Sequence, residues 1–160
     1  MKVLITGAAG FIGGAISKHL IKHGIEVIAF DQKQPAIEGL SKIIQMDIGV
    51  DSPGARIADE IGSCDAIVHA AAVINMGFDN PDVIITNCLG TQQLLRSAEI
   101  LEARCFVYLS SVPVIGVPKK LPITEDHQQS LLLRIMHRNC LESTWSGSHQ
   151  GRIWPGQYCV

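Results

Sequence analysis

The sequence lacks the features that mark membrane proteins and nucleic-acid-binding proteins. Gly, His or a charged residue interrupts each apolar run before the roughly eighteen residues that a membrane-spanning helix needs. The 13 lysines and arginines are fewer than the 15 acidic residues and are interspersed with them. We therefore expect neither nucleic acid nor a membrane as a partner.

Cysteine patterns typical of disulfide-rich or metal-binding proteins are also missing. The five cysteines are odd in number and form no CxxC pair. Met1-Lys2 leads directly into an apolar run, without the cationic segment, apolar stretch and cleavage site of a signal peptide. These absences predict a cytoplasmic protein with reduced thiols and no bound metal.

A regular alternation of strand and helix patterns is present instead. Apolar residues make up 47% of the 160-residue chain, which is enough for the core of one domain. The expected strands span residues 3–6, 26–30, 42–46, 65–72 and 104–109, and the expected helices span 11–23, 53–61 and 81–102. This alternation predicts right-handed βαβ units and an α/β fold, a doubly wound parallel sheet of the Rossmann type.

The most specific motif is the glycine-dense turn Thr6-Gly7-Ala8-Ala9-Gly10-Phe11-Ile12-Gly13 between the first expected strand and helix. Residues without side chains allow a tight turn, let backbone N–H groups approach a pyrophosphate and let the helix pack on the strand. The helix N-terminus adds unpaired N–H groups and a partial positive charge. The turn therefore predicts a dinucleotide site.

The acid at the end of the second expected strand indicates which dinucleotide is bound. Asp31 stands 24 positions after Gly7. A carboxylate there accepts hydrogen bonds from both hydroxyls of the adenosine ribose and repels a 2′-phosphate. We therefore expect NAD rather than NADP.

With these motifs, residues 1–127 resemble an extended short-chain dehydrogenase/reductase of the NAD-dependent epimerase/dehydratase group. The resemblance implies cofactor contacts at Gly7, Ala9, Gly10, Phe11, Ile12, Gly13, Asp31, Asp47, Ile48, Ala70, Ala71, Ala72, Asn87 and Ser110. In the family pattern, Asp47-Ile48 lies against adenine, and Ser111 is the catalytic residue that holds the substrate hydroxyl or carbonyl. Taken singly, the three alanines could also be tight packing, and Asn87 and Ser111 could be only local hydrogen-bonding residues.

The family's chemistry also needs a tyrosine and a lysine four residues apart on a helix beyond Ser111. The tyrosine transfers a proton, and the lysine lowers the pKa of the phenol. This chain has only Tyr108 and Tyr158, and no lysine follows Lys120. Residues 131–139, Leu-Leu-Leu-Arg-Ile-Met-His-Arg-Asn, stand at the expected place.

The character of the chain changes after His127. Residues 1–127 carry 10 basic and 14 acidic residues, whereas residues 128–160 carry three arginines and the single acid Glu142. Both tryptophans lie in the second segment, and no sixth strand follows. We expect an NAD-binding Rossmann domain over 1–127 and a tail over 128–160 that is poorly ordered or irregularly helical, without the substrate domain of the family.

We interpret the tail as a frameshift. If the intended frame starts at the third base of each present codon, Met136-His137 forces alanine and Asn139-Cys140 forces leucine. The free junctions then permit Ala-Tyr-His-Ala-Ser-Lys-Leu, which holds the missing pair, with the slip between His127 and Ser130. The alternatives are a divergent tail and, on the pattern His137-x-x-Cys140 with His149 and Cys159, a zinc site, whose irregular spacing argues against it.

The resemblance implies an NAD-dependent epimerase, dehydratase or dehydrogenase that transfers a hydride at a hydroxyl or carbonyl of a sugar substrate, commonly nucleotide-linked. It also implies a homodimer for the intact family. Without the Tyr-x-x-x-Lys pair, we expect this chain to be catalytically incomplete. The alternatives are a non-catalytic NAD-binding module and an alcohol oxidation like that of the 3β-hydroxysteroid dehydrogenases.

Overall fold

Five parallel strands form one sheet in the order β3-β2-β1-β4-β5. The computed structural model describes residues 1–49, 53–74, 81–111, 115–124 and 127. Its elements are β1 (Lys2–Thr6), α1 (Phe11–Lys22), β2 (Glu26–Asp31), β3 (Lys42–Gln45), α2 (Pro53–Ile61), β4 (Ala66–His69), α3 (Pro81–Val83), the π-helix η1 (Ile84–Gly90), α4 (Thr91–Ile100) and β5 (Cys105–Tyr108). The prediction of a doubly wound parallel sheet is confirmed.

The strand order creates a switch point between β1 and β4. From β1 the chain winds outward through β2 to β3, and then crosses back to β4 and β5. The turns after β1 and β4 consequently leave the sheet in opposite directions, which opens a crevice at the carboxyl ends of the strands. The order of the strands therefore indicates where a ligand site lies.

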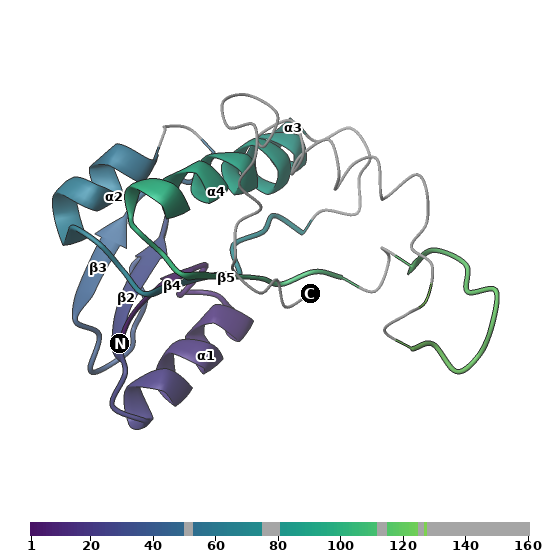
Figure 1. Ribbon diagram of the computed structural model, residues 1–160, viewed down its shortest axis with the longest axis horizontal. Coiled ribbons are helices and arrows are strands. Elements are labelled where there is room, and N and C mark those ends of the chain that lie inside the picture. Colours follow the sequence, from purple (N-terminus) through teal and green to yellow (C-terminus); the bar gives the residue numbers. More distant parts are fainter. Residues whose placement is uncertain (50–52, 75–80, 112–114, 125–126, 128–160) are drawn as a thin grey trace.

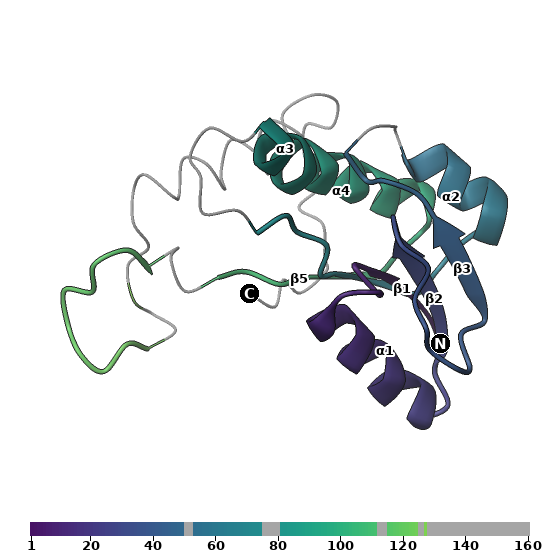
Figure 2. The same ribbon diagram turned by 180° about the vertical axis from the view of Figure 1, so that it is seen from behind.

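Helices cover both faces of the sheet (Figure 1), and the view from behind shows the same two layers (Figure 2). One face, with Val3, Ile5 and Val27, packs against the apolar side of α1. The opposite face, with Leu4, Ile67 and others, packs against α2 and α4. Successive residues of β1 thus enter opposite cores, which explains why its sequence is continuously apolar.

The helix expected over 81–102 is present without a break from Pro81 to Ile100, as α3, the π-helix η1 and α4 in succession. It ends two residues earlier than expected, and its π-helical middle was not expected. Apolar spacing in a sequence does not distinguish i→i+4 from i→i+5 hydrogen bonds, so the wider turns of η1 could not be read from it. Asn87 lies in the middle of this π-helix.

The strand expected over 65–72 ends earlier than predicted, at His69. The hydroxyl of Thr6 accepts the backbone N–H of Ala71 at 3.2 Å, so this amide pairs with a side chain. Residues 70–72 therefore leave the sheet as a separate segment beside the turn after β1.

None of the described helices is long and apolar enough to cross a membrane. Within the same residues, no cluster of three or more His, Cys, Asp or Glu side chains is placed to hold a metal ion. The tail, the frameshift segment and the alternative zinc ligands lie outside the described residues.

Candidate functional site

A pocket of about 530 Å³ opens at the carboxyl ends of the strands, beside the switch point. Five segments line it, one after each of the first four strands and one from the helices that follow β4. The lining residues are Gly7, Ala9, Gly10, Phe30, Asp31, Gln32, Lys33, Met46, Asp47, Ile48, Ala70, Ala71, Ala72, Val73, Asp82, Ile85 and Thr86. The volume lies within the range usual for small-molecule sites.

The turn after β1 is built so closely that only glycine fits at two positions. Gly7 has φ +71°, and a Cβ there would stand 2.7 Å from the backbone nitrogen of Ala71. A Cβ on Gly13 would stand 2.2 Å from the carbonyl oxygen of Gly7. The first helix and the segment after β4 therefore both pack directly on the backbone of this turn.

The N-terminus of α1 opens from this turn without a cap. Gly10 is the N-cap residue, no side chain bonds the first amides, and the first turn contains no acid. The first N–H groups of a helix have no carbonyl partner within it, and they carry a partial positive charge. The end of α1 thus provides backbone donors suited to an anion such as phosphate.

Both carboxylate oxygens of Asp31 are already oriented by backbone amides. Oδ2 accepts the N–H of Ala9 at 2.9 Å, and Oδ1 accepts the N–H of Lys33 at 2.9 Å. A carboxylate has about four acceptor positions, so capacity remains for two further donors from the pocket. The arrangement suits a pair of neighbouring hydroxyl groups.

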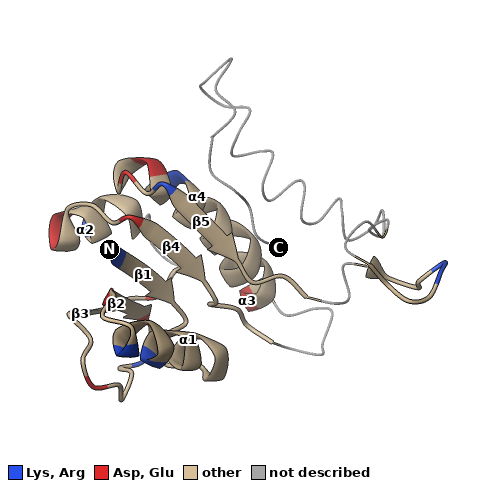
Figure 3. Ribbon diagram, turned by 60° about the horizontal axis from the view of Figure 1, so that its bottom comes forward, with Lys and Arg blue, Asp and Glu red and all other residues tan. Residues whose placement is uncertain are grey.

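The charged side chains around the pocket are mostly acidic. Among the lining residues that the structure describes, Asp31, Asp47 and Asp82 are acidic and Lys33 is the one cation. Figure 3 shows lysine and arginine dispersed over the described elements rather than gathered at one edge of the sheet. An anion bound here would consequently depend on backbone amides more than on basic side chains.

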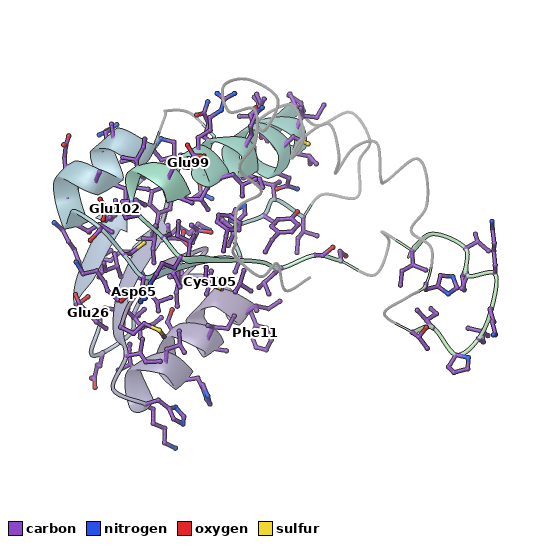
Figure 4. The ribbon with its side chains drawn as sticks, viewed as in Figure 1. Phe11, Glu26, Asp65, Glu99, Glu102 and Cys105 are labelled. Atoms are coloured by element: carbon purple, nitrogen blue, oxygen red, sulfur yellow. The ribbon has the colours of Figure 1, made fainter. Side chains whose placement is uncertain are left out.

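The remaining expected cofactor positions on α1 do not line the pocket with their side chains. Phe11 is 93% exposed and Ile12 is 56% exposed, and Figure 4 shows Phe11 projecting outward from the first turn of α1. Gly13 is buried against Gly7. Phe11 and Ile12 lie in the first turn of α1, so their backbone N–H groups are among the donors at this helix end.

Asn87 does not line the pocket but holds a segment that does. Its Oδ1 accepts the backbone N–H of Val73 at 2.8 Å, and its Nδ2 donates to the carbonyl of Val73 at 2.9 Å. This paired bond fixes the chain just after Ala72. The side chain acts on the pocket wall through the backbone of Val73.

Ser110 and Ser111 follow the last strand, β5. The hydroxyl of Ser110 is buried and has no hydrogen-bond partner among the described residues. Ser111 is exposed. A buried hydroxyl without a partner costs free energy, and Ser110 is not among the residues that line the pocket.

The sequence analysis did not identify a buried chain of hydrogen-bonded polar side chains beneath the pocket. Thr6, His69 and Thr91 are each at most 3% exposed. His69 Nδ1 lies 2.7 Å from the Thr6 hydroxyl, and Nε2 lies 2.8 Å from the Thr91 hydroxyl. Burial lowers the pKa of His69 to about 4. A lone histidine inside the apolar run 65–72 was the only trace of it in the sequence.

The tyrosine that the structure describes is not placed as a catalytic acid. Tyr108 lies in β5, packs against the core cluster and has its ring centroid 5.5 Å from that of His69. Tyr158 lies outside the described residues.

Comparison with known proteins adds evidence from sequence and structure. The model of the NAD-dependent epimerase/dehydratase family matches residues 3–134. UDP-glucose 4-epimerase of Lactobacillus helveticus is 34% identical over 134 residues, covering 79% of this chain and 40% of that protein. A probable UDP-glucuronate 4-epimerase of Rhizobium meliloti is 28% identical over 141 residues, covering 78% and 41%.

The fold has matches among solved structures. A short-chain dehydrogenase/reductase superfamily protein from Agrobacterium tumefaciens, crystallised with bound NAD, superposes with a TM-score of 0.75 at 26% identity. The match covers 92% of this chain and 46% of that one. The chain spans about 40% of the length of the curated relatives named above.

Proposed function

This chain belongs to the NAD-dependent epimerase/dehydratase family, and on that basis we propose that its pocket binds NAD. The observation that carries the proposal is the glycine turn. In this turn the backbone segments lie too close together for a Cβ atom, and the turn leads directly into the uncapped N-terminus of α1. This cradle fits a pyrophosphate, because it offers N–H donors and no competing acid in the first turn of α1.

Each part of the pocket has a role in this proposal. The amides at the start of α1, including those of Phe11 and Ile12, hold the pyrophosphate. Asp31 accepts hydrogen bonds from the adenosine ribose, and Asp47 and Ile48 lie against adenine. The segment 70–72 forms the wall along which the dinucleotide lies.

The reaction we propose is hydride transfer at a hydroxyl or carbonyl of a nucleotide-linked sugar. The names of the relatives, UDP-glucose 4-epimerase and a probable UDP-glucuronate 4-epimerase, support this substrate class. Bound NAD would supply the hydride acceptor. Ser111 would orient the substrate hydroxyl, and Ser110 would contact the cofactor.

We propose that the chain as printed binds NAD without turnover. Proton transfer needs a group such as a tyrosine phenol within reach of the substrate, and Tyr108 is packed in the core cluster instead. Loss of a general acid or base typically lowers the rate by a factor of about 10² to 10⁴. A frameshift after His127 would explain the missing pair.

A thermal melt tests NAD binding directly. NAD is expected to raise the midpoint progressively with concentration, since a ligand at 100 times its Kd stabilises the folded state by about 2.7 kcal/mol. Nicotinamide mononucleotide, which lacks the adenosine that Asp31 would hold, is the matched control and should raise it far less. No shift with NAD at any concentration would refute the proposed function.

A further inference from the structure

The hydroxyls around His69 fix the direction of every hydrogen bond in the buried chain. Thr91 Oγ1 donates its only proton to the carbonyl of Asn87 at 2.7 Å. Its oxygen must therefore accept from His69, and Nε2 of the imidazole must carry the proton.

The other ring nitrogen then has only one possible role. In a neutral imidazole, Nδ1 is an acceptor when Nε2 is protonated, so the Thr6 hydroxyl donates to it at 2.7 Å. The oxygen of Thr6 is in turn the acceptor of the Ala71 N–H. All hydrogen bonds in this series are donated in the same direction, from the amide of Ala71 to the carbonyl of Asn87.

Both ends of this chain act on the pocket wall. At one end Thr6 holds Ala71, and at the other Thr91 holds the backbone of Asn87, whose side chain binds both backbone groups of Val73. Ala71 and Val73 line the pocket, whereas His69 and Thr91 do not.

The wall packs closely on the glycine turn. Gly7 lies so close to Ala71 that even a Cβ would not fit between them. A small shift of residues 70–73 would therefore close or widen the space beside the glycine turn.

We propose that His69 is a positioning residue for the dinucleotide pocket, acting as a neutral Nε2–H imidazole that links Thr6 and Ala71 on one side to Thr91 and Asn87 on the other. The proposal rests on the proposed NAD site. It assigns to His69 and Thr91 an effect on cofactor affinity, although neither contacts the cofactor space.

The principal test compares two buried hydroxyls on α4. Ser97 is a matched control, because it is 1% exposed and its hydroxyl donates to the carbonyl of Gln93, four residues earlier, as Thr91 does to Asn87. Thr91→Val should weaken NAD binding in calorimetry by about fivefold or more, the scale of one lost net hydrogen bond. Ser97→Ala should leave the Kd of NAD within about twofold, and Thr91→Ser should restore the parent value.

Two calorimetric results would overturn the proposal: a Thr91→Val variant that binds NAD as the parent does, or a Ser97→Ala variant that loses as much affinity. If Thr91→Val does not fold, Thr6→Val and Thr6→Ser test the other end of the hydrogen-bond series. Thr6→Val should lose affinity for NAD, and Thr6→Ser should restore it.

A second measurement does not depend on NAD. Nitrogen-15 NMR of labelled histidine, with the His69 signals identified by their loss in His69→Asn, should show a neutral ring protonated at Nε2 near neutral pH. In Thr91→Val this preference should weaken, because Nε2–H loses its acceptor. An Nδ1–H ring or an imidazolium in the parent overturns the proposal, whereas a parent that fails to bind NAD but keeps the Nε2–H ring refutes only the proposed function.

Discussion

The carboxylate of Asp31 and the backbone amide of Ala9 are joined by a 2.9 Å hydrogen bond across 22 residues of sequence. The bond ties the tip of β2 to the glycine turn that follows β1. It orients the acid before any ligand arrives, which lowers the entropic cost of binding. The ribose selectivity that we propose depends on this contact as well as on the charge.

Asp31→Asn is expected to weaken NAD binding by about tenfold, because hydrogen bonds to a charged acceptor are worth more than those to an amide. Binding of NADP should fall less or improve, since the charge that repels a 2′-phosphate is removed. Calorimetric titration of both cofactors measures the ratio. Glu38→Gln removes the same charge at an exposed position away from the pocket and should leave the ratio unchanged.

Gly13→Ala is expected to destabilise the protein by about 2 kcal/mol or more, because its Cβ would meet the Gly7 carbonyl at 2.2 Å and force backbone apart. Gly24→Ala is the matched control, since a Cβ there meets nothing within 4 Å and only the φ of +73° is strained. It should cost about 1 kcal/mol. Urea unfolding of both variants makes the comparison, and equal losses would contradict the close packing of α1 on the turn.

The stability of the protein should fall in mild acid because of His69. Burial lowers the pKa of the folded ring to about 4, from an ordinary value of 6.5. The neutral ring contributes its full stability above pH 6.5, and this contribution is lost as the pH falls from about 6.5 towards 4, where only the unfolded state takes up the proton. The limiting slope is about 1.4 kcal/mol per pH unit.

Urea unfolding between about pH 7 and pH 4.5 measures this slope. The His69→Gln variant retains the other histidines and should lose much of the dependence. The ring is in contact with Thr6, Thr91, Phe106 and Tyr108. An unchanged slope in the variant would show that other groups account for the acid sensitivity.

The frameshift makes a prediction about nucleic acid rather than protein. Sequencing the encoding DNA across codons 125 to 145 should reveal that a one-base change opens a long frame containing Tyr-x-x-x-Lys. The corrected protein should then turn over a nucleotide-linked sugar that the printed chain does not. If no such change exists, the divergent-tail alternative replaces the frameshift.

Local patterning in the sequence was enough to predict most of the fold. Continuous apolar strands such as residues 3–6, separated by segments of helical spacing, leave few arrangements besides a parallel sheet covered on both faces. The glycine turn was also predictable, because a strand, a turn and a helix that are adjacent in sequence must also be adjacent in space. Asp31 was predictable from its place at the end of the next strand.

Long-range contacts were decided only by the tertiary structure. Burial between sheet and helix makes His69 neutral, and bonds to Thr6 and Thr91, 63 and 22 residues away, set its orientation. β4 ends at His69, and the side chain of Asn87 binds the backbone of Val73. Hydrogen bonds between residues far apart in the sequence do not change the spacing of apolar residues within a strand or helix. They therefore cannot be predicted from that spacing.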